Sequence, residues 1–324
     1  MPPLMSARLR TDILTFFADA LTIFETRRLP FSLLCTVSEP SLSPPRPLAS
    51  KPKPPVERLV ILDSSFNPPT VAHRRMVLSA VETYHEAAAA TAEEEGERPA
   101  RGGREAAAAA AAAPRGSVRV LLLLSVNNAD KAPQPASFPH RLAMMYLFAK
   151  DLVRDVARGL EVDIALSSQP YFHSKCELIA RAGGEYYTAP EAMEQVFLAG
   201  YDTLIRIFDP RYYSAGRTME DSLGPFFERA RLRVALRTGD RWGEAEEQRE
   251  YLVGLKDGGL EKVGGKGEWV ARVELVPGHE EGEGVSSTAV RRAVGEGDEG
   301  SLGRLLGDGV REWVLAEALY KEEA

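Results

Sequence analysis

The sequence predicts an α/β fold built on a doubly wound parallel sheet of five to six strands, with helices on both faces. Short, continuously apolar runs alternate along the chain with segments of helical periodicity. Strands that are apolar throughout are typical of parallel sheets, because these sheets are buried on both faces. The expected strands are 58–63, 118–126, 161–167, 195–200, 232–237 and 270–276; a helix is expected from about Val71, and others at 138–153, 175–182, 202–208, 220–229, 286–294 and 301–320.

Composition divides the 324-residue chain into three parts. Residues 1–39 predict an N-terminal helical extension, and the proline-rich residues 40–57 predict a linker. The main domain is expected at 58–324, interrupted by an alanine-rich, low-complexity insertion at 86–117, with a second low-complexity loop at 256–268. The arginines of the extension are typical of a mitochondrial targeting segment but its acidic residues are not, so we favour a helix that packs on the main domain.

Charge and cysteine content narrow the classes of function. The formal net charge of −7 argues against binding a nucleic acid polymer, because no basic surplus exists to displace counterions. Two cysteines without a CxxC pattern favour a reducing compartment, which we expect to be the cytoplasm or nucleus. No apolar run approaches the roughly 20 residues that span a bilayer, so no membrane partner is expected.

A candidate anion site follows the first expected strand, in the sequence DSSFNPPTVAH. Pro68 and Pro69 prevent helix formation before Thr70, which is a good N-cap. The amide groups and dipole of the next helix would therefore point at the end of the strand. His73 would lie in its first turn. A lone histidine on a helix is more often structural, but a strand, a rigid turn and a cap before it favour a functional role.

A second candidate phosphate site lies in Val285–Arg291, sequence VSSTAVR. Hydroxyl side chains at a strand-to-helix transition, with an arginine in the first turn, are suited to binding phosphate. The alternative is a plain serine N-cap.

Both segments resemble one family. The stretch from Ser65 to His73 resembles the (H/T)xxH element of the nucleotidylyltransferase superfamily, in the SFNPxTxxH form of nicotinamide mononucleotide adenylyltransferases, and VSSTAVR resembles that family's ISSTxxR motif. A divergent fungal-type branch fits best, and the match implies a Rossmann-like sheet. The implied catalytic residues are His73, Lys131 and Arg291; those implied for ATP are Ser65, Phe66, Thr70, His73, Gly200, Asp202, Ser287, Thr288 and Arg291; those implied for the acceptor are Asn67, Lys131 and Tyr212.

Three of these assignments rest on weaker matches. Lys131 ends NNADK, which resembles a loop whose lysine meets the mononucleotide phosphate; a solvated surface lysine is the alternative. Gly200 and Asp202 resemble a GxD motif that contacts adenosine, although Asp202 could also be a helix N-cap. Arg237 begins a segment that resembles the family's RxG motif.

The chain departs from the family pattern at two places. Ser64 stands where the family usually has glycine. After GxD the family commonly has a tryptophan that stacks on the pyridine ring, whereas this chain offers Phe208, Tyr212 and Tyr213, with Trp242 too far along.

The resemblance implies an enzyme that transfers AMP from ATP to nicotinamide or nicotinate mononucleotide, with Mg²⁺ carried by ATP and no metal held by the protein. Pantetheine-phosphate adenylyltransferase is the nearest rival enzyme, and the SFNP form argues against it. No Walker A motif is present, and no GxGxxG motif follows an expected strand, so a dehydrogenase is disfavoured. The alternative from another class is an ATP-binding protein or slow ATPase of the same fold that acts through a protein partner.

Overall fold

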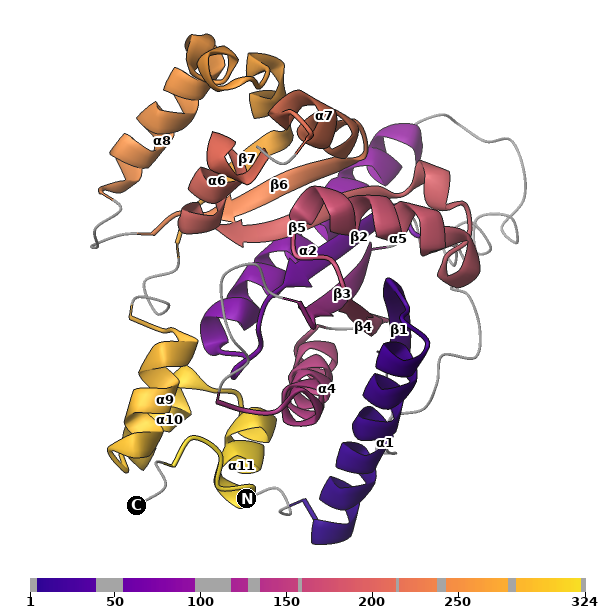
Figure 1. The fold of residues 1–324 in the computed structure, drawn as a ribbon, viewed down its shortest axis with the longest axis vertical. Helices are drawn as coiled ribbons and strands as arrows, with labels where there is room; N and C mark the ends of the chain where they lie inside the picture. Colours follow the sequence, from indigo (N-terminus) through magenta and orange to yellow (C-terminus); the bar gives the residue numbers. More distant parts are fainter. Residues whose placement is uncertain are drawn as a thin grey trace.

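The computed structural model describes residues 5–38, 55–96, 118–127, 135–156, 159–213, 216–237, 243–278 and 284–321. Within them a seven-stranded sheet has the order β1-β4-β3-β2-β5-β6-β7 (Figure 1). β1 pairs antiparallel with β4, and every other neighbouring pair is parallel. This confirms the predicted doubly wound sheet and adds one strand to the expected maximum of six.

The strands are β1 Phe31–Val37, β2 Arg58–Asp63, β3 Val118–Ser125, β4 Val162–Ser167, β5 Glu194–Gly200, β6 Ala230–Ala235 and β7 Val273–Val276. The α-helices are α1 Ala7–Thr26, α2 Val71–Gly96, α4 Phe138–Asp155, α5 Phe172–Tyr186, α6 Tyr201–Ile207, α7 Met219–Arg229, α8 Ala245–Gly254, α9 Ser287–Gly295, α10 Glu299–Leu305 and α11 Asp308–Ala316. In the parts of the chain that the structure describes, no helix combines the length and apolar character needed to cross a membrane.

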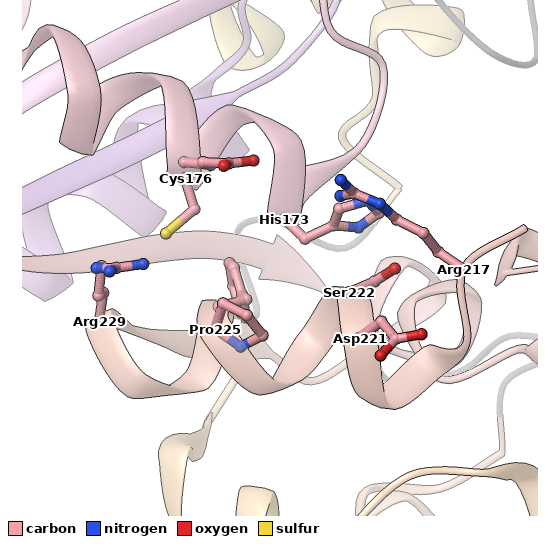
Figure 2. A pocket seen from close by; sticks show the side chains of 9 residues that line it. His173, Cys176, Arg217, Asp221, Ser222, Pro225 and Arg229 are labelled. Carbon is pink, nitrogen blue, oxygen red and sulfur yellow. The ribbon is translucent and has the colours of Figure 1, made fainter.

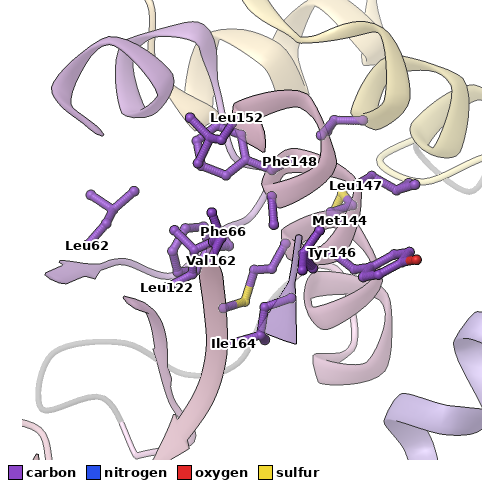
Figure 3. Packing of buried hydrophobic residues seen from close by; sticks show 14 of the residues in the cluster. Leu62, Phe66, Leu122, Met144, Tyr146, Leu147, Phe148, Leu152, Val162 and Ile164 are labelled. Carbon is purple, nitrogen blue, oxygen red and sulfur yellow. The ribbon is translucent and has the colours of Figure 1, made fainter. Parts of the chain in front are cut away.

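The two faces of the sheet bury alternate residues of each strand. In β2, Val60 and Leu62 belong to a core shared with α1, α2, α4 and the C-terminal helices, whereas Leu59 and Ile61 belong to a second core shared with α5, α6 and α7. Successive side chains of a strand point to opposite faces, so a strand that is apolar throughout supplies both cores. Figure 3 shows α4 packed on the first of these faces.

The topology places a switch point beside β2. The chain goes from β2 outward through β3 and β4, then returns to pair β5 with the other side of β2 and continues to β6 and β7. In sheets of this type the ligand site lies at the carboxyl ends of the strands, next to such a switch. The ends of β2 and β5 are therefore the expected position of a site.

The N-terminal segment differs from the prediction of a purely helical extension. α1 begins after Ser6, whose side chain accepts a hydrogen bond from the Leu9 amide (3.2 Å), and it buries Phe17 against Tyr146 of α4 (ring centroids 6.3 Å apart). Residues 31–37, however, form β1. This strand pairs with β4 at the sheet edge, a contact with residues over 120 positions away that local periodicity cannot show.

Three other expectations are corrected. The predicted loop at 256–268 contains consecutive short helical turns that bury Leu260. The predicted helix 301–320 is divided into α10 and α11 at Gly307, where an added Cβ would lie 2.6 Å from Asp151 Oδ2. The expected insertion at 86–117 overlaps α2, which continues to Gly96; its remainder, the linker residues 40–54 and Trp242 lie outside the described residues.

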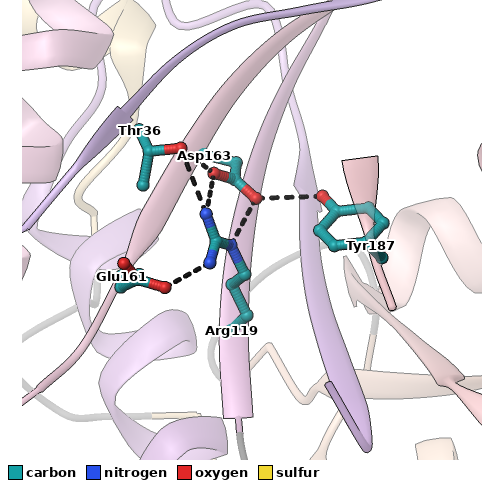
Figure 4. A network of polar contacts seen from close by, with 5 residues as sticks. All are labelled: Thr36, Arg119, Glu161, Asp163 and Tyr187. Carbon is teal, nitrogen blue, oxygen red and sulfur yellow. Dashed lines mark hydrogen bonds and ion pairs between the residues drawn. The ribbon is translucent and has the colours of Figure 1, made fainter. Parts of the chain in front are cut away.

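A buried polar network joins β1, β3 and β4 at the end of the sheet where strands β3 and β4 begin (Figure 4). Asp163 accepts from Arg119 Nε and Nη2 (2.6 and 2.8 Å), Thr36 Oγ1 (2.6 Å) and the Tyr187 hydroxyl (3.0 Å). Glu161 also pairs with Arg119. Asp163 is fully buried, so its charge is compensated entirely by these donors. The network is on the side of the sheet opposite the carboxyl ends and is structural.

Candidate active site

The segment after β2 continues the line of the sheet for one residue and then turns into α2. The Ser64 amide donates to the Leu123 carbonyl of β3 (3.3 Å), which holds Ser64 at the carboxyl end of the strand. Phe66 adopts a left-handed φ of 46° and its ring is fully buried, 6.1 Å from the His73 ring. A buried ring cannot face a ligand, so only the backbone of Phe66 is available to one. The neighbouring Ser65 is exposed.

His73 is fixed by hydrogen bonds to both ring nitrogens. Nδ1 accepts from the backbone N–H of Thr70 (3.0 Å), and the Thr70 hydroxyl lies 2.9 Å from the same atom. Nε2 lies 3.0 Å from Ser64 Oγ. Burial, with a smaller contribution from the positive charge of Arg237, lowers the pKa of His73 from 6.5 to about 4. The imidazole is therefore neutral at pH 7, and because Nδ1 accepts, its proton is on Nε2.

The carboxylate that ends β2 is neutralised from α5. Lys175 Nζ pairs with Asp63, and both side chains are buried. Nothing in the sequence linked these residues, which are 112 positions apart; a lysine in the first turn of an amphipathic helix is the only signal available. The pairing removes a negative charge that would otherwise repel an anion at the end of β2.

The second predicted motif packs directly on the first. The Ser287 hydroxyl donates to the Pro68 carbonyl (2.8 Å) and Arg291 Nη1 donates to the Asn67 carbonyl (2.8 Å). Arg291 Nη2 also donates to Thr288 Oγ1 (3.1 Å). The contacts with Pro68 and Asn67 join residues more than 200 positions apart and place the N-terminus of α9 beside that of α2.

The side chain of Asn67 faces the protein and not the solvent. Asn67 is 4% exposed, and its Oδ1 accepts a hydrogen bond from the Tyr320 hydroxyl (2.8 Å). Tyr320 follows α11, so the chain's last described helix also stabilises the loop. Ser286 caps α9 by accepting from the Ala289 amide (3.1 Å), as the N-cap alternative predicts, and it does so together with the contacts of Ser287 and Arg291.

A third group of residues lies at the end of β5. Gly200 is the N-cap of α6, so the alternative in which Asp202 is the cap is wrong. Asp202 pairs with Arg237 (3.0 Å) and Arg206 (2.6 Å). An added Cβ at Gly200 would lie 2.8 Å from Asp202 Oδ1 and 3.4 Å from Arg237 Nε, so glycine leaves the space that this ion pair occupies.

An aromatic cluster formed by Tyr171, His173, Tyr212 and Tyr213 connects the start of α5 with the segment after α6. Tyr171 stacks on His173 (centroids 5.5 Å, interplanar angle 8°) and meets Tyr212 edge-on (6.4 Å), while His173 is 5.9 Å from Tyr213. The sequence suggested Tyr212 and Tyr213 as ring partners but gave no reason to group them with Tyr171, which is 37% exposed.

A cavity of about 410 Å³ between α5 and α7 adjoins this cluster at His173 (Figure 2). Arg217 and Arg229 line it, and neither side chain forms an ion pair or hydrogen bond with another residue that the structure describes. Burial, and next the charge of Arg217, lowers the pKa of His173. Glu177 and Asp221 also line the cavity, so its walls carry charges of both signs beside the aromatic cluster.

Most of the predicted residues thus lie together where β2 and β5 end. His73, Thr70, Ser287, Thr288 and Arg291 are joined by the contacts above. Lys131, Thr238 and Gly239 lie outside the described residues. The described part of the chain contains no group of three histidine, cysteine, aspartate or glutamate residues that could hold a metal ion.

The chain is similar to known proteins in structure and in sequence. No protein-family model matches the chain. Two structures of Plasmodium falciparum nicotinic acid mononucleotide adenylyltransferase, complexed with APC and with NaAD, are 12% and 13% identical, each with a TM-score of 0.43 over 82% of this chain and 97% of theirs.

A relative found by sequence shares a much larger fraction of identical residues with this chain. The Schizosaccharomyces pombe protein named "Putative nicotinamide mononucleotide adenylyltransferase" is 32% identical over 243 residues, which cover 74% of this chain and 77% of the relative. The aligned length exceeds two thirds of both chains. The chain therefore belongs to the nicotinamide mononucleotide adenylyltransferase family of nucleotidyltransferases.

Proposed function

We propose that the protein transfers AMP from ATP to nicotinamide or nicotinate mononucleotide, forming a dinucleotide and pyrophosphate. One observation carries the proposal: Arg291 and Ser287 contact the loop of residues 64–70 directly, next to a histidine whose Nε2 bears a proton. A structural serine cap alone would not bring an arginine to the N-terminus of a second helix. Two helix N-termini beside each other, with an arginine between them, suit a chain of phosphates.

In this reaction the protein orients two phosphates and stabilises charge, and it needs no covalent intermediate. An oxygen of the mononucleotide 5′-phosphate attacks the α-phosphorus of ATP in line, and the bond to pyrophosphate breaks. The first amides of α2 and the positive charge of Arg237 would stabilise the α-phosphate, and His73 would support this site from the first turn of α2. The pairing of Lys175 with Asp63 keeps that region free of uncompensated negative charge.

The leaving pyrophosphate belongs at the start of α9. The Ser287 hydroxyl is donated to Pro68, so Ser287 would contribute mainly its backbone amide. Arg291 has further guanidinium N–H groups besides the two that donate to Asn67 and Thr288, and these can donate to phosphate oxygens. The Thr288 hydroxyl keeps its own hydrogen and can also donate to phosphate. ATP would bring Mg²⁺ as part of the substrate, and the ion would be held chiefly by the phosphates.

The acceptor belongs on the other side of the loop. Tyr212 and the exposed Tyr171 offer aromatic faces for a pyridine ring. Lys131 remains our proposal for the group that holds the mononucleotide phosphate. Asp202 and Gly200 are proposed to face the adenosine, with Arg237 holding the Asp202 carboxylate in place.

The experiment is direct. The purified protein is incubated with Mg²⁺-ATP and each mononucleotide, and the dinucleotide and pyrophosphate are measured together, with a His73→Asn variant as control. Dinucleotide from the wild type, reduced by about 100-fold or more in the variant, supports transfer. Phosphate release without an acceptor, and no dinucleotide, would instead support the slow ATPase and remove the proposal.

A further inference from the structure

Ser64 lies beside His73 at the carboxyl end of β2. Its backbone is held in line with β2 by the hydrogen bond to Leu123, and its Oγ lies 3.0 Å from His73 Nε2. Ser64 is half-buried, whereas the adjacent Ser65 is exposed. In the described part of the chain, His73 is the side-chain partner of this hydroxyl.

The direction of this hydrogen bond follows from the other side of the ring. The Thr70 backbone N–H can only donate, so Nδ1 must accept and Nε2 must carry the proton. Nε2–H therefore donates to Ser64 Oγ. A hydroxyl that accepts in this way keeps its own hydrogen for a third group, and an acceptor bonded to it would strengthen both hydrogen bonds.

We propose that Ser64 donates the hydrogen bond to the reacting phosphate of ATP, and that His73 acts through Ser64 as a positioning residue. This inference rests on the proposed function. A phosphate oxygen at the end of β2 would accept from the Ser64 hydroxyl, whose oxygen is held in place by the imidazole. The residue that departs from the family pattern thereby becomes part of the binding site.

The surrounding charges support an anion at this point. Asp63, the residue before Ser64, is compensated by Lys175, and Arg237 lies near enough to His73 to influence its ionisation. The negative charge that adjoins the hydroxyl along the chain is therefore compensated. A neutral imidazole also suits the role, because it donates one hydrogen bond and carries no charge that would require its own counter-ion.

The test is a double-mutant cycle with Ser64→Ala, His73→Asn and the double variant, each measured for kcat/KM of transfer and for Mg²⁺-ATP affinity by calorimetry. If the two residues act as one unit, each single change lowers kcat/KM on the order of 10²-fold and the double variant is no worse than either. Ser64→Thr, which keeps the hydroxyl, should recover most of the activity. Ser79→Ala is the matched control: it lies on α2, its hydroxyl accepts from Arg233 (3.0 Å), and it is remote from the end of β2; it should leave both readouts unchanged.

Three outcomes separate the proposals. Wild-type activity in Ser64→Ala combined with a large loss in His73→Asn would show that His73 contacts the phosphate directly, and would overturn the inference. Losses that multiply in the double variant would overturn it too. If the wild type forms no dinucleotide, the proposed function fails, and calorimetry still decides whether Ser64 and His73 are coupled in binding ATP; no coupling there overturns the inference as well.

Discussion

The low pKa of His73 predicts how the stability of the protein depends on pH. The pKa is about 4 in the folded protein and has its ordinary value of 6.5 in the unfolded chain, because burial and the charge of Arg237 disfavour the imidazolium. Between pH 6.5 and about pH 4 the unfolded state therefore binds a proton that the folded state does not, and stability falls as the pH falls through this range. Between pH 7 and pH 5 this single group should remove about 2 kcal/mol from the free energy of unfolding, and the full shift corresponds to about 3 kcal/mol.

The assay compares the wild type with His73→Asn in urea denaturation at several pH values. Asparagine does not titrate, and its side-chain oxygen can still accept from the Thr70 amide. Other titrating groups contribute equally to both proteins, so the difference between the two stability curves isolates His73. The wild type should lose stability relative to the variant as the pH falls from 7 to 5. Two parallel curves would show that the imidazole is accessible and titrates normally, and would refute the low pKa assigned to His73.

Three further predictions test the surrounding structure. Asp163→Ala should lower the free energy of unfolding by about 3–5 kcal/mol because it leaves Arg119 buried with fewer partners. Glu161→Gln changes a side chain that is 43% exposed, and it should alter the free energy of unfolding by less than about 1 kcal/mol. Thermal unfolding of the two variants tests this difference. Burial raises the pKa of Asp151 to about 6, so its charged form destabilises the fold above that pH. Asp151→Asn should therefore stabilise the protein at pH 8, by at most about 3 kcal/mol, and have little effect at pH 4. Equal effects at both pH values would contradict this. Arg291→Lys should lower kcat/KM for ATP roughly 10-fold or more, because lysine cannot contact both Asn67 and Thr288 and also bind phosphate. Unchanged steady-state kinetics would exclude Arg291 from the site.

Turn and helix-start signals were readable from the sequence because they are local. Pro68 and Pro69 delay α2 until Thr70, and Ser286 caps α9, since each depends on residues within one helical turn. The apolar strands were recognised for the same reason. β1 was missed because its pairing with β4, across more than 120 residues, gives it a place in the sheet that its own seven residues do not specify.

The sequence by itself thus determined the parallel strands of a doubly wound sheet and the two segments suited to phosphate. The tertiary structure alone decided how those segments meet: Arg291 on the Asn67 carbonyl, and Tyr320 on the Asn67 side chain. It also revealed the pairing of Lys175 with Asp63, two residues that no sequence pattern linked to each other. The physical reason is that a helix cap or a strand depends on residues that are neighbours in the chain. The partner of a buried charge or of a hydrogen-bond donor depends instead on which residues the packed core brings within about 3 Å.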